Sequence, residues 1–370
     1  MDTFLSKKFR FFTFISLTAV VFIHGYNLHN RYLQPFSIVE ETLTITTFIE
    51  YWVANGLFRF TVPLFFLISG FLFALKDEQP HKIRMRKRLK TLLLPYLIWS
   101  AVALLITYGW QSFPATSMTL KDAQLDQLGD NRPYWQMGWG AILLRWSLFP
   151  IAFQLWFIRS LLIYNAAYPI ILKAINKCPI VWFGICTFLW VHTFGTPLIE
   201  GEGVLFFSLG IYMQKTNFNV SIPSTRLSLQ YWLPVFLLVS TLKTFLAFHL
   251  HWGTASFFIL SLLHKVTVIS GLITIWYGSN SVVYYCMKRS WFVWLTSFSF
   301  IIYVIHVPLI NYSLCFAYRY YPFFLYNRLL LFILLPICII AFAIIVGAIF
   351  RLLSPKLYNM CTGERGVTKP

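Results

Sequence analysis

Ionisable side chains interrupt several long apolar runs of this 370-residue sequence. The first run, FFTFISLTAVVFIHGYNLHN at residues 11–30, carries His24 near its far end, and later runs carry Arg59 and His306. An imidazole exchanges protons near neutral pH, and a guanidinium binds carboxylate or phosphate oxygens. Ionisable groups are costly inside a membrane and mark functional sites there, so His24 is a candidate for proton transfer and Arg59 for anion binding. His306 is a second-rank candidate, for lining a cavity.

Other polar or aromatic side chains at similar depth are second-rank candidates for lining a cavity. Lys243 and Arg159 lie inside their own apolar runs, and Trp156 could stack on a sugar ring. Each has an ordinary alternative, because long basic side chains reach the membrane interface and tryptophan packs there. A histidine on a helix can likewise only hydrogen-bond a neighbouring carbonyl.

Carboxylates show the opposite distribution. All twelve Asp and Glu residues fall in expected tails, loops or span ends, so no expected span interior holds one. Buried cations need partners. Water, backbone carbonyls, loop acids such as Glu50, Glu200 and Glu202, or a bound anion would have to supply them. A bound anion fits a substrate with phosphates or carboxylates and argues against a cation pump built on acidic residues.

The elements that must position these residues are membrane-spanning helices. Hydrophobic residues make up 58% of the chain and charged residues 11%, against about 25% charged in soluble domains. Runs of about 20 apolar residues cross a bilayer as helices. We therefore expect an all-α polytopic integral membrane protein with about ten spans, at residues 11–29, 54–75, 91–110, 148–172, 179–195, 201–214, 229–250, 254–277, 292–315 and 327–352. The sixth is short and Gly-rich, which leaves nine spans as an alternative.

Basic residues set the expected orientation. Segment 76–90 carries seven Lys and Arg residues, and with ten spans it falls on the same side as both termini, which the positive-inside rule places in the cytoplasm. The net charge of +18 is then a topology signal with attraction to anionic lipid, and no nucleic-acid partner is expected. We expect one membrane domain over residues 1–370, with a core of about 9–353 and a cytoplasmic tail at 354–370. The polar insertion at 111–147 is expected to form a lid or a short surface helix. The six cysteines show no metal-binding spacing, and no metal is expected.

Two prolines predict open backbone near the candidate residues. Pro63 removes the helical partner of the Arg59 carbonyl, and Pro308 does the same for Val304 beside His306. Such kinks are tolerated in lipid where they face protein or a polar cavity. The sequence therefore predicts a cavity that reaches in from the outer face.

Six segments occur in order along nearly the whole chain: the first span with His24, RFTVPLFFLISGFLF from Arg59, RKRLKTLLLPYLIW before and into the third span, LWFIRSLLIYNAAYPII from Leu155, FFSLGIYM from Phe206, and SFSFIIYVIHVPLI from Ser297. In these segments the sequence resembles the acyltransferase 3 family of bacterial integral membrane proteins.

The resemblance implies transfer of acetyl or another small acyl group from acyl-CoA, as a co-substrate with no permanently bound cofactor, to a surface carbohydrate. It implies that the protein lies in the cytoplasmic membrane. His24 matches the family's essential span-one histidine, the expected general base, and Arg59 matches the span-two arginine that would hold donor phosphates or an oxyanion. The basic residues before the third span would receive CoA or act only as topology anchors; they are Arg84, Arg86, Lys87, Arg88 and Lys90.

One departure from the family concerns the first span. The family typically has an Asp fourteen positions and an Arg eleven positions before the histidine, and these positions hold Arg10 and Thr13 here. Arg10 would substitute by position, or the chain would use another donor or be inactive. The competing function is export of an exopolysaccharide without catalysis; another membrane acyltransferase architecture is a weaker alternative because its motifs are absent.

Overall fold

Helices form nearly all of the structure, a computed structural model that describes residues 3–26, 34–130 and 132–365. Across these ranges no strand forms, and a single isolated bridge joins Gly195 to Glu200. Eight helical segments of the described chain are long and apolar enough to cross a membrane: Thr3–Gly25, Ile45–Ala74, His81–Gln111, Phe153–Lys177, Thr225–His249, Thr254–Gly278, Ser299–Tyr320 and Arg328–Leu353. The expected all-α polytopic membrane architecture is confirmed.

The difference from ten spans lies in two short helices. The predicted spans 179–195 and 201–214 correspond to α9 (Pro179–Val191) and α10 (Gly201–Lys215), of 13 and 15 residues. At 1.5 Å per residue, 15 residues rise about 22 Å, less than the roughly 30 Å of a hydrocarbon core. The first predicted span, 11–29, corresponds to α1 (Thr3–Gly25), which ends at Gly25. Residues 27–29 lie outside the described residues.

The chain divides into two units. The first comprises residues 1–23, 33–85 and 163–293, and the second comprises 24–32, 86–162 and 294–370, within the described ranges. The helices α1, α4 (His81–Arg88), α8 (Trp156–Lys177) and α14 (Ser290–Thr296) run from one unit into the other. The single-domain organisation expected from the sequence stays a prediction.

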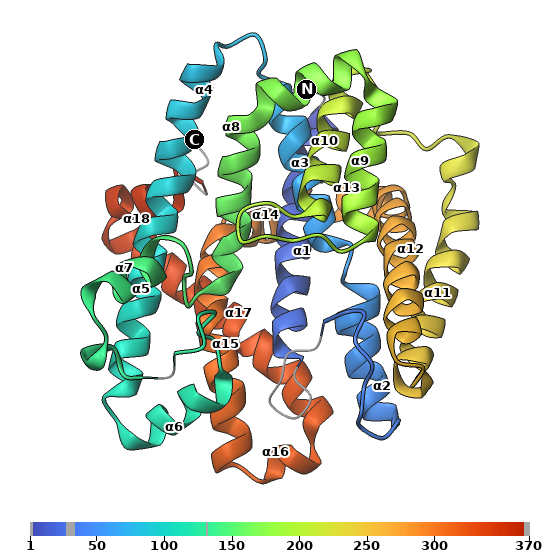
Figure 1. The fold of residues 1–370 in the computed structure, drawn as a ribbon. Coiled ribbons are helices and arrows are strands. Elements are labelled where there is room, and N and C mark those ends of the chain that lie inside the picture. The colour runs from blue at the N-terminus through green and yellow to red at the C-terminus, as the bar shows by residue number, and fades with distance from the viewer. Residues whose placement is uncertain (1–2, 27–33, 131, 366–370) are drawn as a thin grey trace. The chain divides into compact units, whose positions relative to one another are not determined.

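In the first unit, α3 (Thr61–Ala74) packs directly on α10, as Figure 1 shows. A Cβ atom built on Gly70 would overlap the backbone of Phe207, and one built on Gly210 would overlap the Leu67 carbonyl. Small residues at such positions let membrane helices approach to backbone contact. This reciprocal contact explains why the short sixth run is rich in glycine.

The first unit is completed by a pair of long helices. α11 (Leu229–His249) and α12 (Thr254–Gly278) lie side by side (Figure 1), and α13 (Asn280–Cys286) follows. Phe12 of α1 stacks on Trp276 of α12, with ring centroids 5.1 Å apart. Aromatic packing of this kind anchors α1 against α12.

The second predicted span is broken into pieces. Helix α2 (Ile45–Tyr51) continues as the π-helical segment η1 (Trp52–Leu57), the chain turns at residues 58–60, and α3 begins at Thr61. The kink expected at Pro63 is confirmed, and the break extends about one turn before it. Mid-helix π segments occur often at functional sites, and this one holds Asn55.

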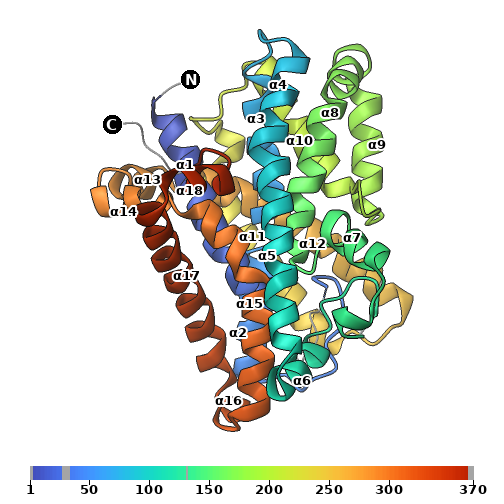
Figure 2. The ribbon, with the colours of Figure 1, turned by 90° about the vertical axis from the view of Figure 1, so that its left-hand side faces the viewer.

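In the second unit, α5 (Leu94–Gln111) follows the π-helical η2 (Leu89–Leu93), and α15 (Ser299–Tyr320) packs beside α17 (Arg328–Leu353), as Figure 2 shows. Helix α15 is interrupted at Val307, which has non-helical φ −110° and ψ 135°. The break predicted at Pro308 is therefore present, one residue from His306. Short helices α16 (Phe323–Tyr326) and α18 (Pro355–Thr362) complete the unit.

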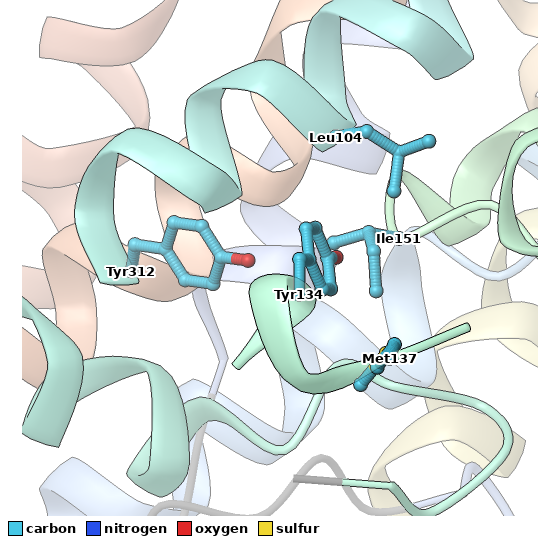
Figure 3. Packing of buried hydrophobic residues seen from close by; sticks show 5 residues of the cluster. All are labelled: Leu104, Tyr134, Met137, Ile151 and Tyr312. Carbon is cyan, nitrogen blue, oxygen red and sulfur yellow. The ribbon is translucent and has the colours of Figure 1, made fainter. Parts of the chain in front are cut away.

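The polar insertion at 111–147 folds into short helices in the second unit. It contains α6 (Pro114–Ala123), η3 (Tyr134–Gln136) and α7 (Trp139–Ser147). Tyr134 and Met137 pack with Leu104, Ile151 and Tyr312 in a buried apolar cluster (Figure 3). Ion pairs also hold the segment, with 2.6 Å between nitrogen and oxygen in both Arg145–Asp126 and Arg319–Asp122. The expected short helix is confirmed, and the apolar cluster and the ion pairs hold the segment in place.

Candidate functional site

Two histidines meet in the second unit. His24 lies in the last turn of α1, and His306 lies in α15 just before its break. Their ring centroids are 5.3 Å apart, and the ring of Phe153 lies 5.0 Å from that of His24 in an edge-on contact. The structure therefore brings together two of the residues selected from the sequence, with an aromatic wall beside them.

The hydrogen bond of His306 fixes which of its ring nitrogens is basic. Nδ1 lies 3.0 Å from the Ile302 carbonyl oxygen. A carbonyl only accepts, so Nδ1 carries the proton and, in the neutral ring, Nε2 keeps its lone pair. This Nε2 is buried, and no described residue bonds to it. His306 thus presents a buried proton-accepting nitrogen, on a ring whose centroid lies 5.3 Å from that of His24.

Gln154 holds the broken backbone next to this histidine. It lies in η4 (Phe153–Leu155), and its Nε2 donates to the carbonyls of Tyr303 at 3.2 Å and Val307 at 3.1 Å. The Tyr303 hydroxyl donates back to the Gln154 carbonyl at 2.6 Å. Kinked backbone in lipid needs such replacement partners. These three bonds fix the stretch of α15 that carries His306.

Arg59 belongs to the first unit, where it is held by Asn55. The Asn55 side-chain oxygen accepts from Arg59 Nε at 3.1 Å and also from Nη2. Asn55 is fully buried in η1, and Arg59 lies in the turn that directly follows this segment. The guanidinium is therefore oriented by a neutral amide. The prediction that Arg59 and His24 line one cavity stays a prediction.

Lys243 is fully buried and approaches the same asparagine. Its Nζ donates to the Asn55 carbonyl and lies 3.5 Å from Nδ1 of His264. Carbonyls at the end of a helix have no partner within it, so this one is open to an outside donor. The alternative in which Lys243 reaches the membrane interface is wrong, because its side chain ends inside the protein.

Glu202 and Lys265 complete this polar group. Glu202 accepts a 3.1 Å hydrogen bond from Trp190 Nε1 and interacts electrostatically with Lys265 and Arg59. The Lys265 ammonium lies 5.1 Å from the centroid of the Trp190 ring. We call this group the cation cluster; it comprises Asn55, Arg59, Glu202, Lys243, His264 and Lys265.

The structure corrects the expectation that all acidic residues lie in tails, loops or span ends. Glu50, placed in a loop by the sequence analysis, is only 2% exposed in α2, within the apolar segment Ile45–Ala74. Glu202, placed at a span end, brings a carboxyl group among the buried basic side chains. Three basic side chains still face one carboxylate there. The arrangement can therefore accept an anion, such as a carboxylate or phosphate group.

Arg159 and Trp156 lie on the first turn of α8. Arg159 is 9% exposed, and its Nη1 donates to the Leu148 carbonyl, so its charge remains inside the protein. Trp156 is half-buried beside Phe157, with ring centroids 6.2 Å apart. Their proposed roles in substrate binding stay predictions.

The basic residues before the third span separate into distinct environments. Arg84 is buried, and its Nη2 donates to Asp77 at 2.9 Å. Lys90 pairs with Glu364 at 3.0 Å on the surface, while Arg86 and Lys87 are exposed and Arg88 is half-buried. Their role as donor contacts stays a prediction, as does the alternative of topology anchors.

At the departure from the family's first-span pattern, both side chains bond to backbone carbonyls. Arg10 Nη2 donates to the Val293 carbonyl at 2.8 Å. Thr13 Oγ1 donates to the Phe9 carbonyl one turn back at 2.8 Å, an ordinary bond within a helix. Arg10 therefore keeps its positive charge at the acid's position, and Thr13 supplies none.

Sequence reasoning missed four polar residues that the structure brings into these sites. Asn55, His264 and Lys265 join the cation cluster, and Gln154 supports His306. Each had a signal, because each is a polar or ionisable residue within or next to an apolar run, and Asn55 precedes Arg59 by one helical turn. Among the described residues, no group of three His, Cys, Asp or Glu side chains could hold a metal ion.

Comparison with known proteins agrees with this architecture. The profile of an acyltransferase domain family, acyltransferase 3, matches residues 11–352. The chain is 23% identical over 385 aligned positions to the succinoglycan biosynthesis protein ExoH of Rhizobium meliloti strain 1021, covering 99% of this chain and 94% of that protein. No solved structure matches it significantly. With its family match and the eight membrane-length helices among its described residues, the chain is a multi-pass membrane acyltransferase and belongs to the acyltransferase 3 family.

Proposed function

We propose that the protein transfers an acetyl or similar small acyl group from acyl-CoA to a hydroxyl of a cell-surface carbohydrate or its lipid-linked precursor. The reaction would take place at the bacterial cytoplasmic membrane. The family match supports acyl transfer, and the name of the relative from Rhizobium meliloti supports a polysaccharide acceptor. The observation that carries the proposal is the close pair of His24 and His306 rings, in which His306 has a buried Nε2 that carries a lone pair.

In the proposed reaction, His24 acts as the general base. It takes the proton of the acceptor hydroxyl while that oxygen attacks the thioester carbonyl carbon. The carbon–oxygen ester bond forms, the carbon–sulfur bond breaks, and the proton passes to the departing CoA thiolate. His306 lies at ring-contact distance and can hydrogen-bond the protonated His24 through its unprotonated Nε2. The second histidine would stabilise the charge that develops on the first.

The cation cluster gives the first unit a place for negative charge. Its three basic side chains, with a single carboxylate, suit the phosphates of a donor or of a lipid-linked acceptor. Asn55 orients Arg59 without cancelling its charge. We assign the cluster to anion contact and the histidine pair to proton transfer. Export without catalysis is disfavoured by the family match.

The experiment is mass spectrometry of the surface glycan from three strains. They carry the intact gene, a deletion, or His24→Ala expressed at wild-type level. We expect an acyl-sized mass to disappear from the glycan in both altered strains, and its size to identify the acyl group. Unchanged glycan mass in all strains, with less surface glycan only on deletion, would instead favour export.

A further inference from the structure

A pocket of about 440 Å³ in the first unit lies apart from the cation cluster. One side is formed by the turn after α3 and the start of α4, and the other by the second half of α8. Its volume falls within the usual range for small-ligand sites, roughly 300 to 1,000 Å³. The turn belongs to the basic segment 76–90, which the positive-inside rule assigns to the cytoplasm.

The inner wall of the pocket is held by Arg84. Its guanidinium contacts two neighbouring rings, 4.6 Å from the centroid of Phe73 and 4.7 Å from that of Tyr168. It donates to Asp77 at 2.9 Å and to the Phe73 carbonyl at 3.1 Å. Lys215 also pairs with Asp77. The single carboxylate of the pocket is therefore already neutralised.

The rim of the pocket carries uncompensated positive charge. Lys173 and Lys177 are exposed and lie one turn apart on α8, so both ammonium groups reach the same side of the helix. No ion pair to either lysine occurs among the described residues. Two free lysines at a pocket rim suit an anion with several oxygens, such as a phosphate.

The floor of the pocket is flat and largely apolar. The rings of His81 and Tyr168 are almost parallel, with an interplanar angle of 12°, and Pro169 and Leu172 lie beside them. His81 Nε2 lies 2.9 Å from the Asn165 carbonyl oxygen, so this nitrogen carries a proton and Nδ1 is the other ring nitrogen available to a ligand. A flat apolar floor with a cationic rim matches a nucleotide, which joins an aromatic base to phosphates.

We infer that this pocket binds the phosphate-bearing nucleotide end of the acyl donor, with Lys173 and Lys177 as the phosphate contacts. The inference rests on the proposed function, because it takes acyl-CoA as the donor. It differs from the sequence expectation in its residues: of the five basic side chains selected before the third span, only Arg84 lines the pocket, and there it serves as a wall. An anionic lipid headgroup offers the same phosphate chemistry and must be distinguished by experiment.

The test measures binding by the purified full-length protein in nanodiscs of zwitterionic lipid. The probes are CoA, CoA without its 3′-phosphate, and pantetheine, which has no phosphate. The pocket variant is Lys173→Gln with Lys177→Gln, and the control is Lys76→Gln with Lys82→Gln, two exposed lysines outside the pocket. We expect the Kd for CoA to rise at least tenfold in the pocket variant and to stay within twofold in the control. Pantetheine should bind all three proteins alike.

A kinetic readout separates this site from the catalytic step. With acyl-CoA as donor, the pocket variant should raise KM while leaving kcat unchanged. If the wild type binds CoA and the pocket variant binds it equally well, the inference is overturned and the proposed function stands. If that variant instead loses only co-purifying phosphatidylglycerol, measured by native mass spectrometry, the pocket is a lipid site and the inference is overturned. A wild type that neither binds nor uses acyl-CoA would overturn both.

Discussion

His24 and His306 lie with their ring centroids 5.3 Å apart, although they come from opposite ends of the chain. Two positive charges at this distance repel by about 3 kcal/mol at an effective dielectric constant of roughly 20. Double protonation is therefore disfavoured, and one imidazole of the pair stays neutral. A general base must be neutral before it takes a proton, and after it has done so a neutral neighbouring imidazole does not repel its positive charge.

Substitution of His306 should separate the roles of its two ring nitrogens, Nδ1 and Nε2. His306→Asn can retain a donor toward the Ile302 carbonyl but lacks a group at the Nε2 position, whereas His306→Gln reaches that position with an amide. We expect His306→Asn to lower kcat about 100-fold or more, within the range for acid–base groups. His306→Gln should retain more activity, because its amide can still hydrogen-bond His24. The measurement is acyl transfer from acyl-CoA in membrane vesicles.

Protein amount and melting temperature serve as controls for these two variants. Equal activity of His306→Asn and wild type, at equal protein level, would contradict a role for Nε2.

The histidine pair also shows how far the sequence could lead. His24 and His306 were selected separately, because each is an ionisable residue in an apolar run, but one sequence does not reveal which runs touch. Asn55 and Gln154 were not among the candidates, because a neutral amide carries no charge that would mark it within an apolar run. Both act where the regular helix is interrupted, Asn55 in a π segment and Gln154 at a proline break, and the contacts made there are known only from the folded chain.

The short helices show a second limit of sequence reasoning. A hydropathy pattern detects apolar length, so α9 and α10 appeared as spans, and the chain's all-helical class was predictable. Whether a 15-residue helix crosses the membrane depends on its neighbours. The short, Gly-rich run left nine spans as an alternative, and its close contact with α3 is known only from the folded chain.

Removal of the Asn55 side chain should release Arg59. In Asn55→Ala the guanidinium loses the acceptor of two hydrogen bonds, while the Lys243 bond to the residue 55 backbone carbonyl remains available. We expect at least a tenfold fall in kcat/KM for acyl transfer, with a smaller loss for Asn55→Asp, which keeps an acceptor oxygen. Activity of Asn55→Ala equal to that of wild type would show that Arg59 needs no such support.

Alanine at the contact between α3 and α10 should destabilise the first unit. Gly70→Ala and Gly210→Ala each place a Cβ where backbone of the other helix lies. Overpacking of this kind costs about 1–3 kcal/mol. We expect both variants to melt several degrees below wild type in detergent. Gly184→Ala is the matched control, because nothing lies within 4 Å of its new Cβ, and it should melt at or above the wild-type temperature.

A uniform response of the three glycine variants would contradict the packing account. If Gly184→Ala destabilised the protein as much as Gly70→Ala, the effect would belong to glycine in helices generally.

Acid should weaken the ion pairs of Asp77. Burial alone would raise the pKa of this carboxyl, but its hydrogen bond and charge interaction with Lys215, together with Arg84, outweigh burial and lower the pKa. Since the folded-state pKa lies below the ordinary value, the stabilisation is fully present above about pH 4 and is lost as the pH falls through the folded-state pKa. Asp77→Asn should therefore melt below wild type at pH 7, and the gap should close in acid.

The comparison is a series of melting curves for both proteins from pH 7 to pH 3. Glu78→Gln, at an exposed neighbouring position, controls for the loss of one carboxylate. A gap between Asp77→Asn and wild type that stays constant across this range would refute the linkage.

The most direct test of acyl transfer by the histidine pair uses purified protein in liposomes, with acyl-CoA labelled in its acyl group and a glycan acceptor. Wild type should form labelled ester and release CoA thiol in equal amounts, and His24→Ala at equal protein level should do neither. Ester formation by His24→Ala at the wild-type rate would contradict acyl transfer by the histidine pair.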